Sequence, residues 1–186
     1  MSSLSFFLAW FAAPAQVGAV MPSSAALADA LTAEVSPASA PVIELGPGTG
    51  AVTQALLRRG VPEDRLALVE LTAKFARRLE ARFPAAHVLN MDATRLRDVE
   101  LFAGQPAGAV VSGLPLVLMP LWDVMAVLKS AFHHLAPDGA FYQFTYRFGP
   151  PVPRSILARL DLRAERIGGT FANVPPASVY RITRRR

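Results

Sequence analysis

Short apolar runs alternate with longer stretches of amphipathic spacing through most of the chain. The runs predict buried strands at residues 41–43, 66–69, 87–90, 107–112 and 140–146. The stretches between them carry apolar residues at helical intervals and predict helices over residues 25–35, 51–59, 73–83 and 120–135. Strands that alternate with helices are typical of an α/β fold with a mostly parallel sheet, whose ligands bind at the carboxyl ends of the strands.

The ends of several predicted elements are marked by glycine and proline. Gly60 is expected to stop the helix that begins at residue 51, and residues 36–41 form a loop before the first strand. Residues 137–139 predict a turn before the aromatic strand. Two final segments, 163–170 and 178–183, predict a closing antiparallel pair joined across residues 173–176.

The first predicted strand leads directly into a glycine-rich turn, Glu44-Leu45-Gly46-Pro47-Gly48-Thr49-Gly50. A side chain at any of its glycines would keep the backbone from lying against a ligand, and glycine adopts positive φ without strain. Such turns also use glycine for structural reasons alone, so this turn leaves both interpretations open. Its spacing differs from the G-x-G-x-x-G of dinucleotide-binding turns, and no lysine follows it, so phosphate is not the expected ligand.

Acidic residues stand at the ends of three successive predicted strands. Glu70 follows about twenty residues after the last glycine of the turn, where a strand-end carboxylate can accept both hydroxyls of a ribose. Asp92 and Ala93 follow the third strand, at a position suited to the exocyclic amine of adenine, and Glu44 faces the amino-acid end of the same ligand. Together these residues outline an adenosine with a cationic tail.

This combination resembles the class I S-adenosylmethionine-dependent methyltransferases. The resemblance implies a Rossmann-like fold with a mostly parallel seven-stranded sheet and an antiparallel C-terminal strand. It also implies S-adenosylmethionine as the cofactor and S-adenosylhomocysteine as its product.

The composition fits one core of that kind. With 186 residues and 52% hydrophobic content, the chain can bury one such domain and is too short for a second of similar size. Cysteine is absent from the sequence, which excludes disulfides, a thiolate nucleophile and cysteine-ligated zinc. The three histidines are too few and too clustered to indicate a metal site, so no metal is expected.

The basic charge is spread unevenly along the sequence. The net charge is +5 and the pI about 10.4, yet the first basic residue is Arg58, and Arg184-Arg185-Arg186 closes the sequence. A basic surface suits either RNA or anionic lipid headgroups, and charge alone does not distinguish them. Solubility is a sufficient reason for the same charge.

The N-terminal segment favours the lipid. At 100° per residue, the bulky side chains of residues 4–11 gather on one face and the small ones on the other. The segment is far shorter than the about 20 apolar residues that span a bilayer, and Pro14 ends it, so we expect it to lie in the membrane interface. The expected membrane contacts are Phe6, Phe7, Trp10 and Phe11. The alternatives are a secretory signal ending near residues 13–15, or a helix that packs on the domain or on a second subunit.

A short motif, Ser112-Gly113-Leu114-Pro115, follows the fourth predicted strand. Methyltransferases that act on exocyclic amines carry Asn or Asp here, then Pro and an aromatic residue. In this chain Ser112 replaces the amide or carboxylate, and Leu116 replaces the aromatic. A flat base would lose a stacking contact worth roughly 1 to 3 kcal/mol, whereas an aliphatic amine would lose nothing.

With these residues the whole chain resembles the bacterial phospholipid N-methyltransferases that methylate phosphatidylethanolamine, which are similar to the ribosomal RNA adenine dimethylases. The resemblance lies in residues 17–24, 44–53, 112–115 with 119–120, 143–146 and 173–181. It implies transfer of up to three methyl groups to the lipid amine, towards phosphatidylcholine. The expected domains are residues 1–35, an amphipathic membrane-interface helix with a lid helix, and residues 36–186, the methyltransferase domain.

The site residues expected from these motifs fall into three groups. The cofactor contacts are Glu44, Gly46, Gly48, Thr49, Gly50, Glu70, Leu71, Asp92, Ala93 and Ser112. The catalytic candidates are Ser112, as acceptor for the amine, and Tyr146 and Tyr180, whose ring faces can hold its cationic forms. The headgroup contacts are Met21, Ser23, Ser24, Tyr146, Arg147, Tyr180 and Arg181. The arginines can pair with the lipid phosphate, and both tyrosines have core or lid packing as the alternative.

Two other functions remain open at this point. An RNA adenine N6-methyltransferase fits the basic charge and the family kinship, but Ser112, Leu116 and the lack of an appended helical domain oppose it. A non-catalytic membrane-associated module is the other. The expected partners are the phospholipid substrate and an anionic membrane surface, without nucleic acid. The expected location is cytoplasmic, peripheral on the inner face of the cytoplasmic membrane.

Overall fold

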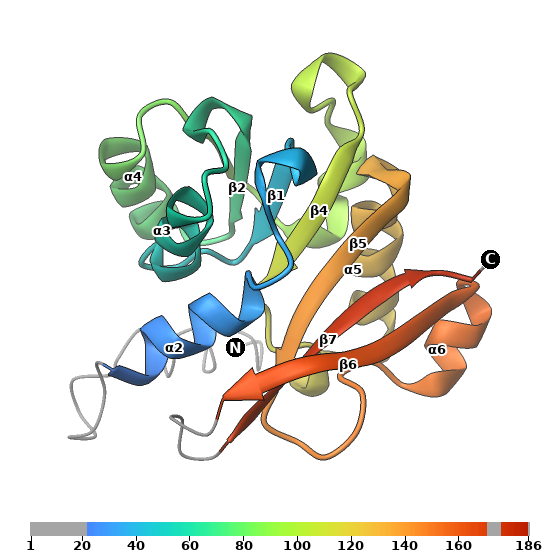
Figure 1. Cartoon of the computed structure of the whole chain (residues 1–186). Helices are drawn as coiled ribbons and strands as arrows, with labels where there is room; N and C mark the ends of the chain where they lie inside the picture. The colour runs from blue at the N-terminus through green and yellow to red at the C-terminus, as the bar shows by residue number, and fades with distance from the viewer. Residues whose placement is uncertain (1–21, 171–175, 186) are drawn as a thin grey trace.

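A seven-stranded sheet forms the centre of the computed structural model, which describes residues 22–170 and 176–185 (Figure 1). The strands are β1 Val42–Leu45, β2 Leu66–Glu70, β3 His87–Asn90, β4 Ala107–Ser112, β5 Leu135–Thr145, β6 Leu162–Thr170 and β7 Ala177–Arg184. Their order is β3-β2-β1-β4-β5-β7-β6. The pairs from β3 to β5 are parallel, and β7 runs antiparallel to β5 and β6. The predicted mostly parallel sheet with an antiparallel C-terminal strand is confirmed.

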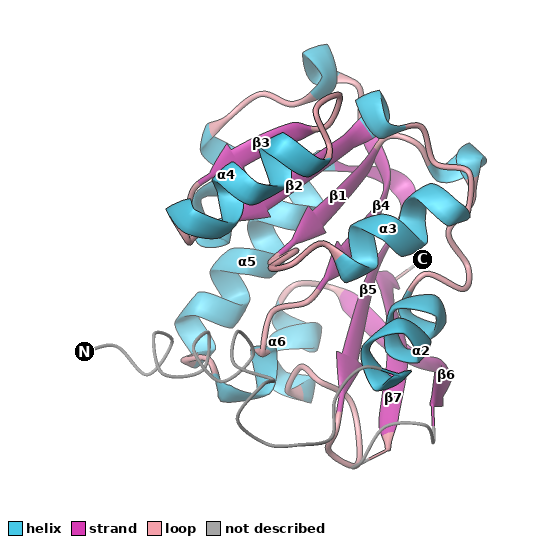
Figure 2. Ribbon diagram, turned by 90° about the vertical axis from the view of Figure 1, so that its left-hand side faces the viewer, coloured by secondary structure: helices cyan, strands magenta, loops and turns pink. Residues whose placement is uncertain are grey.

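Helices cover both faces of this sheet (Figure 2). One face packs against α2 (Pro22–Leu31), α3 (Ala51–Arg58) and α4 (Ala73–Arg82), and the other against α5 (Leu121–His134) and α6 (Arg154–Arg159). Short 3₁₀ helices complete the chain: η2 Pro37–Ser39, η3 Glu63–Arg65, η4 Ala93–Asp98, η5 Phe102–Gly104 and η6 Leu116–Leu118.

Because helices pack on both faces of the sheet, the central strands are continuous apolar runs. Every residue of β1 and β2 is buried, because a parallel strand between two helical layers has no face in water. The edge strand β3 has only partly buried and exposed residues. Strands β1 to β5 all end at the same edge of the sheet, here called the carboxyl edge; the loop that follows β5 lies there, at the bottom of Figure 1.

Several boundaries differ from the sequence-based expectation. Helix α2 begins at Pro22 and ends at Leu31 rather than spanning 25–35, and the hydroxyl of Thr32 donates to the Ala28 carbonyl in its last turn. Strand β5 starts at Leu135, and the expected turn at 137–139 is a bulge within it, since its pairing with β4 skips from Leu135 to Ala140. The skip leaves two of these residues exposed, because they have no partner in β4.

Part of the expected architecture lies outside the described residues. This applies to the amphipathic segment of residues 4–11, to Met21 and to most of the connection at 173–176. Within the described part of the chain, no helix is long and apolar enough to cross a membrane.

Candidate functional site

The glycine turn between β1 and α3 is held in a conformation that suits glycine. Gly46, Gly48 and Gly50 have φ of 68°, 55° and 86°. A Cβ at Gly46 would lie 2.9 Å from Leu114 Cδ2, and one at Gly50 would lie 2.7 Å from Phe83 Cε2. A Cβ at Gly48 would meet nothing within 4 Å. Gly46 and Gly50 therefore permit close packing, while the backbone of Gly48 borders open space.

Glu70, at the end of β2, binds this turn directly. Its Oε2 accepts a hydrogen bond from the Gly48 N–H at 3.1 Å, and its Oε1 accepts one from the Thr72 N–H at 2.8 Å. The side chain is 2% exposed, while the next residue, Leu71, is 44% exposed. The carboxylate expected to bind ribose thus lies beside the turn expected to bind the rest of the nucleoside, and it also fixes that turn. Its contact with ribose stays a prediction.

Glu44 lies at the other side of the turn, within β1. It is 1% exposed, and the hydroxyl of Thr53 in α3 donates to its Oε2 at 2.6 Å. Burial raises the pKa of Glu44 to about 8; the Thr53 hydrogen bonds lower it in part, and the nearby Glu70 charge raises it further. Sequence reasoning missed Thr53, whose signal is a polar side chain on the otherwise apolar inner face of α3.

Asp92 and Ala93 follow β3 at the carboxyl edge, as expected. Asp92 is the N-cap of η4, and its Oδ1 accepts from both the backbone N–H and the hydroxyl of Thr94, each at 2.8 Å. Ala93 is 8% exposed. Asp92 therefore has a local structural role through one carboxylate oxygen, beside the adenine contact that stays a prediction.

The turn after β4, residues 112–115, lies against the glycine turn. Ser112 is fully buried, and its Oγ accepts from the Leu114 N–H at 3.2 Å. The Gly113 N–H donates to the Leu45 carbonyl at 2.8 Å, and a Cβ at Gly113 would lie 2.8 Å from the carbonyl oxygen of Gly46. The structure thereby brings the expected acceptor residue Ser112 next to the expected cofactor turn.

Gln143 holds the same turn from β5, and sequence reasoning gave it no role. It pairs in register with Ser112, so the two side chains share one face of the sheet. Its Nε2 donates to the Leu114 carbonyl at 2.9 Å and to the Phe144 carbonyl at 3.0 Å. Both partners are acceptors, so the nitrogen is fixed there and Oε1 faces elsewhere. Among the described residues nothing donates to this buried oxygen.

The tyrosine candidates are only partly brought together. Tyr180 in β7 pairs with Gln143 and is 8% exposed, so it lies on the Ser112 face of the sheet. Tyr146 follows β5 and is 36% exposed, and its ring contacts Phe144, with ring centroids 5.4 Å apart. Phe144 belongs to the opposite face, which packs against α2.

The remaining candidates for headgroup contacts lie in different parts of the structure. Arg147 is exposed, and its N–H donates to Thr145 Oγ1. Arg181 is paired with Glu34 at 3.1 Å and with Glu165 at 2.8 Å, so its charge is engaged away from Ser112. Ser23 and Ser24 fall in the first turn of α2.

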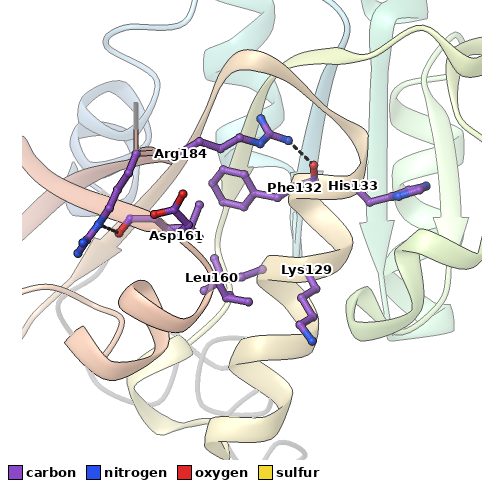
Figure 3. A pocket seen from close by; sticks show the side chains of 9 residues that line it. Lys129, Phe132, His133, Leu160, Asp161 and Arg184 are labelled. Carbon is purple, nitrogen blue, oxygen red and sulfur yellow. Dashed lines mark hydrogen bonds between the residues drawn. The ribbon is translucent and has the colours of Figure 1, made fainter.

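A cavity among the described residues lies away from these turns. It has a volume of about 380 Å³ and lies between the last turns of α5, the start of β6 and the end of β7 (Figure 3). Arg184 in its wall donates to the Phe132 carbonyl at 2.6 Å and to the Ala136 carbonyl at 2.6 Å, so this arginine caps the end of α5. The cavity borders the amino ends of the strands and is separate from the turns described above. In the part of the chain that is described, no cluster of three or more His, Asp or Glu side chains could hold a metal.

Comparison with known proteins agrees with this geometry. Residues 42–139 match the family described as a methyltransferase domain, and this segment holds the glycine turn, Glu70 and the turn at Ser112. The ornithine lipid N-methyltransferase of Singulisphaera acidiphila is 37% identical over 113 residues, which are 56% of either chain. The match thus spans about half the length of this relative.

Solved structures share the fold at much lower identity. A TehB-like SAM-dependent methyltransferase of Corynebacterium glutamicum has a TM-score of 0.65 at 15% identity, with 97% of each chain covered. Magnesium protoporphyrin IX methyltransferase of Synechocystis, with bound SAM, has a TM-score of 0.65 at 12% identity over 100% of this chain and 98% of that one. The glycopeptide N-methyltransferase MtfA, complexed with SAM, has a TM-score of 0.64 at 15% identity, with 87% and 94% covered. The expected Rossmann-like fold is confirmed, and the expected cofactor is the ligand named for the last two structures.

Proposed function

Because the chain belongs to the methyltransferase domain family, we propose that it methylates the amine of a membrane lipid, with phosphatidylethanolamine as the acceptor and S-adenosylmethionine as the donor. The ornithine lipid relative supports a lipid amine as the class of acceptor. The observation that carries the proposal is the turn after β4. There Ser112 lies against the glycine turn, and Leu116 points inward with 3% exposure, so this turn offers no aromatic face on which a base could stack.

The residues present fit the donor. The open side of Gly48 leaves room for it, and the carboxylates of Glu70 and Asp92 stand at adjacent strand ends for ribose and adenine. Glu44 offers a negative charge near the turn once it ionises. S-adenosylmethionine supplies a methyl group activated by a sulfonium charge, so the task of the chain is to hold a neutral amine beside it.

The acceptor amine needs hydrogen-bond acceptors that leave its lone pair free. Ser112 and Gln143 share one face of the sheet, and the oxygen Gln143 Oε1 is without a donor among the described side chains. A hydroxyl oxygen and an amide oxygen both accept N–H bonds. Tyr180, in register with Gln143, supplies a ring beside them, and orienting two reactants in this way can account for about 7 to 11 kcal/mol of a barrier.

The lipid phosphate would be met at the mouth of the site. Arg147 is exposed next to Tyr146 directly after β5, where a guanidinium can pair with phosphate and a phenol can donate to it. We propose that the enzyme works as a peripheral protein on the inner face of the cytoplasmic membrane. Residues 4–11, outside the described part of the chain, would add an interfacial helix to this contact.

Methyl transfer to vesicles tests the proposal. Purified protein would receive radiolabelled methyl donor with vesicles of phosphatidylethanolamine, vesicles of ornithine lipid, or unmodified ribosomal RNA. We expect label in phosphatidylethanolamine, and a much smaller amount with Glu70→Ala. Label only in ornithine lipid would keep the reaction and change the acceptor, whereas label in RNA would replace the proposal by adenine methylation. Absence of label from all three would contradict catalysis.

A further inference from the structure

The exposed large hydrophobic side chains of the described residues all follow the carboxyl ends of parallel strands. Leu71 comes directly after β2, with 44% exposure. The others follow the adjacent strands β4 and β5. They are Leu118 at 48%, Leu121 at 59%, Trp122 at 72%, Tyr146 at 36% and Phe148 fully exposed. We call the five residues after β4 and β5 the apolar rim.

The opposite edge of the sheet has a different character. The loops that enter β2 and β4 carry charged residues, including those of η3 and residues 95–100, and every large hydrophobic side chain described there is at least partly covered. Scattered exposed apolar residues are ordinary on a protein surface, but their confinement to one edge marks an interaction surface. That edge is the one at which Ser112 and the glycine turn lie.

The charges around the apolar rim fit an anionic bilayer. Residues 113–122 and 146–153 contain no Asp or Glu, and Arg147 stands exposed between Tyr146 and Phe148. The nearest carboxylate on α5 is the half-buried Asp123. Trp and Tyr prefer the interface between headgroups and acyl chains, and an arginine there can bury its stem while its head meets phosphate.

We propose that the apolar rim docks into the surface of a lipid bilayer and holds the carboxyl edge against the headgroups. The inference rests on the proposed function for its substrate, and it adds a second membrane contact, formed by the folded domain itself. In this orientation a lipid amine lies at the depth of Ser112 and reaches the site without leaving the bilayer. The rim then decides whether lipid in membranes is methylated, independently of cofactor binding.

Tryptophan fluorescence tests the docking without catalysis. The sequence contains two tryptophans, Trp10 and Trp122, so Trp10→Phe leaves Trp122 as the single probe in the full chain. With vesicles of phosphatidylethanolamine and phosphatidylglycerol, we expect a blue shift and quenching by lipids brominated on their acyl chains. Unquenched Trp122 would overturn the proposal, because the rim would then be covered by residues 1–21 or by a second copy, or would stay in water.

A rim variant then separates docking from chemistry. Leu121→Ser, Trp122→Ser and Phe148→Ser combined avoid every residue assigned to the cofactor or the amine. We expect at least tenfold less protein to float with vesicles and a similar loss of activity on vesicles. Cofactor affinity and activity on dispersed short-chain phosphatidylethanolamine should stay within twofold. Unchanged flotation, or an equal loss on dispersed lipid, would contradict the rim. Quenched Trp122 without methylation of any lipid would contradict the proposed function and leave the rim standing.

Discussion

The hydroxyl of Thr53 donates a 2.6 Å hydrogen bond to the carboxylate of Glu44, which is 1% exposed within β1. The two residues join the end of the first strand to the helix that begins after the glycine turn. Burial outweighs the hydrogen bonds and raises the pKa of Glu44 to about 8, so the folded chain holds a proton on this carboxyl at neutral pH.

This proton makes the free energy of unfolding depend on pH. Unfolding returns the pKa of Glu44 from about 8 to 4.5, so the folded chain binds more protons between these values and loses stability as pH rises through that window. Glu44→Gln removes the loss. We expect the variant to be more stable than the wild type by about 2 to 4 kcal/mol at pH 8.5 and equal to it near pH 4, as measured by urea unfolding of the ligand-free protein. A constant difference across this range would show that Glu44 titrates normally.

The same carboxyl predicts proton release when the cofactor binds. A ligand with a cationic amino-acid end favours the ionised form of Glu44 and expels its proton. We expect calorimetry in buffers of different ionisation enthalpy to detect a released proton near pH 7 for the wild type and a much smaller release for Glu44→Gln. The variant should also bind the cofactor more weakly, by roughly 1 to 3 kcal/mol. Equal proton release from both proteins would place the amino-acid end away from Glu44.

Glu70 fixes the glycine turn and is expected to bind ribose, and replacing it by alanine tests both roles. Glu70→Ala removes the acceptor for the Gly48 and Thr72 N–H groups and the expected acceptor for ribose. We expect S-adenosylmethionine binding to weaken by about 1 to 3 kcal/mol in calorimetry, with a lower melting temperature. The matched control is Glu80→Ala, which removes an exposed carboxylate on α4 and should change neither quantity measurably.

The glycine turn predicts opposite outcomes for two similar substitutions. Gly48 and Gly50 both have positive φ, so alanine at either position costs about 1 to 2 kcal/mol of backbone strain. In Gly50→Ala the added methyl group also collides with Phe83, so this variant should have the lower melting temperature of the two. The methyl group of Gly48→Ala has no protein atom within 4 Å. We expect Gly48→Ala to fold and to bind the cofactor poorly. Full affinity in Gly48→Ala would mean that the ligand does not approach this residue.

The sequence predicted the parts of this site that depend on strand topology. Buried aliphatic runs place Glu44, Glu70 and Asp92 at three neighbouring strand ends, because consecutive parallel strands finish at one edge. It did not predict contacts made across the sheet, such as that of Gln143 with Leu114 at a separation of 29 residues. Arg181 shows the same limit. Its pairing with Glu34, 147 residues away, follows from where α2 packs, and spacing along the chain carries no signal of it.

The oxygen Oε1 of Gln143, to which no described residue donates, allows a test of how the lipid amine is bound. Gln143→Leu removes the two hydrogen bonds that Nε2 donates to the Leu114 and Phe144 carbonyls, so we expect a loss of about 1 to 3 kcal/mol in unfolding free energy. A purely structural role would stop there. If Oε1 also receives the amine, KM for the lipid should rise and kcat should fall, with cofactor affinity unchanged. Gln105→Leu breaks only an exposed hydrogen bond from Arg65; it is the control for the substitution itself and should leave all of these quantities near the wild-type values. Unchanged KM and kcat in Gln143→Leu would assign Gln143 to the architecture of the turn alone.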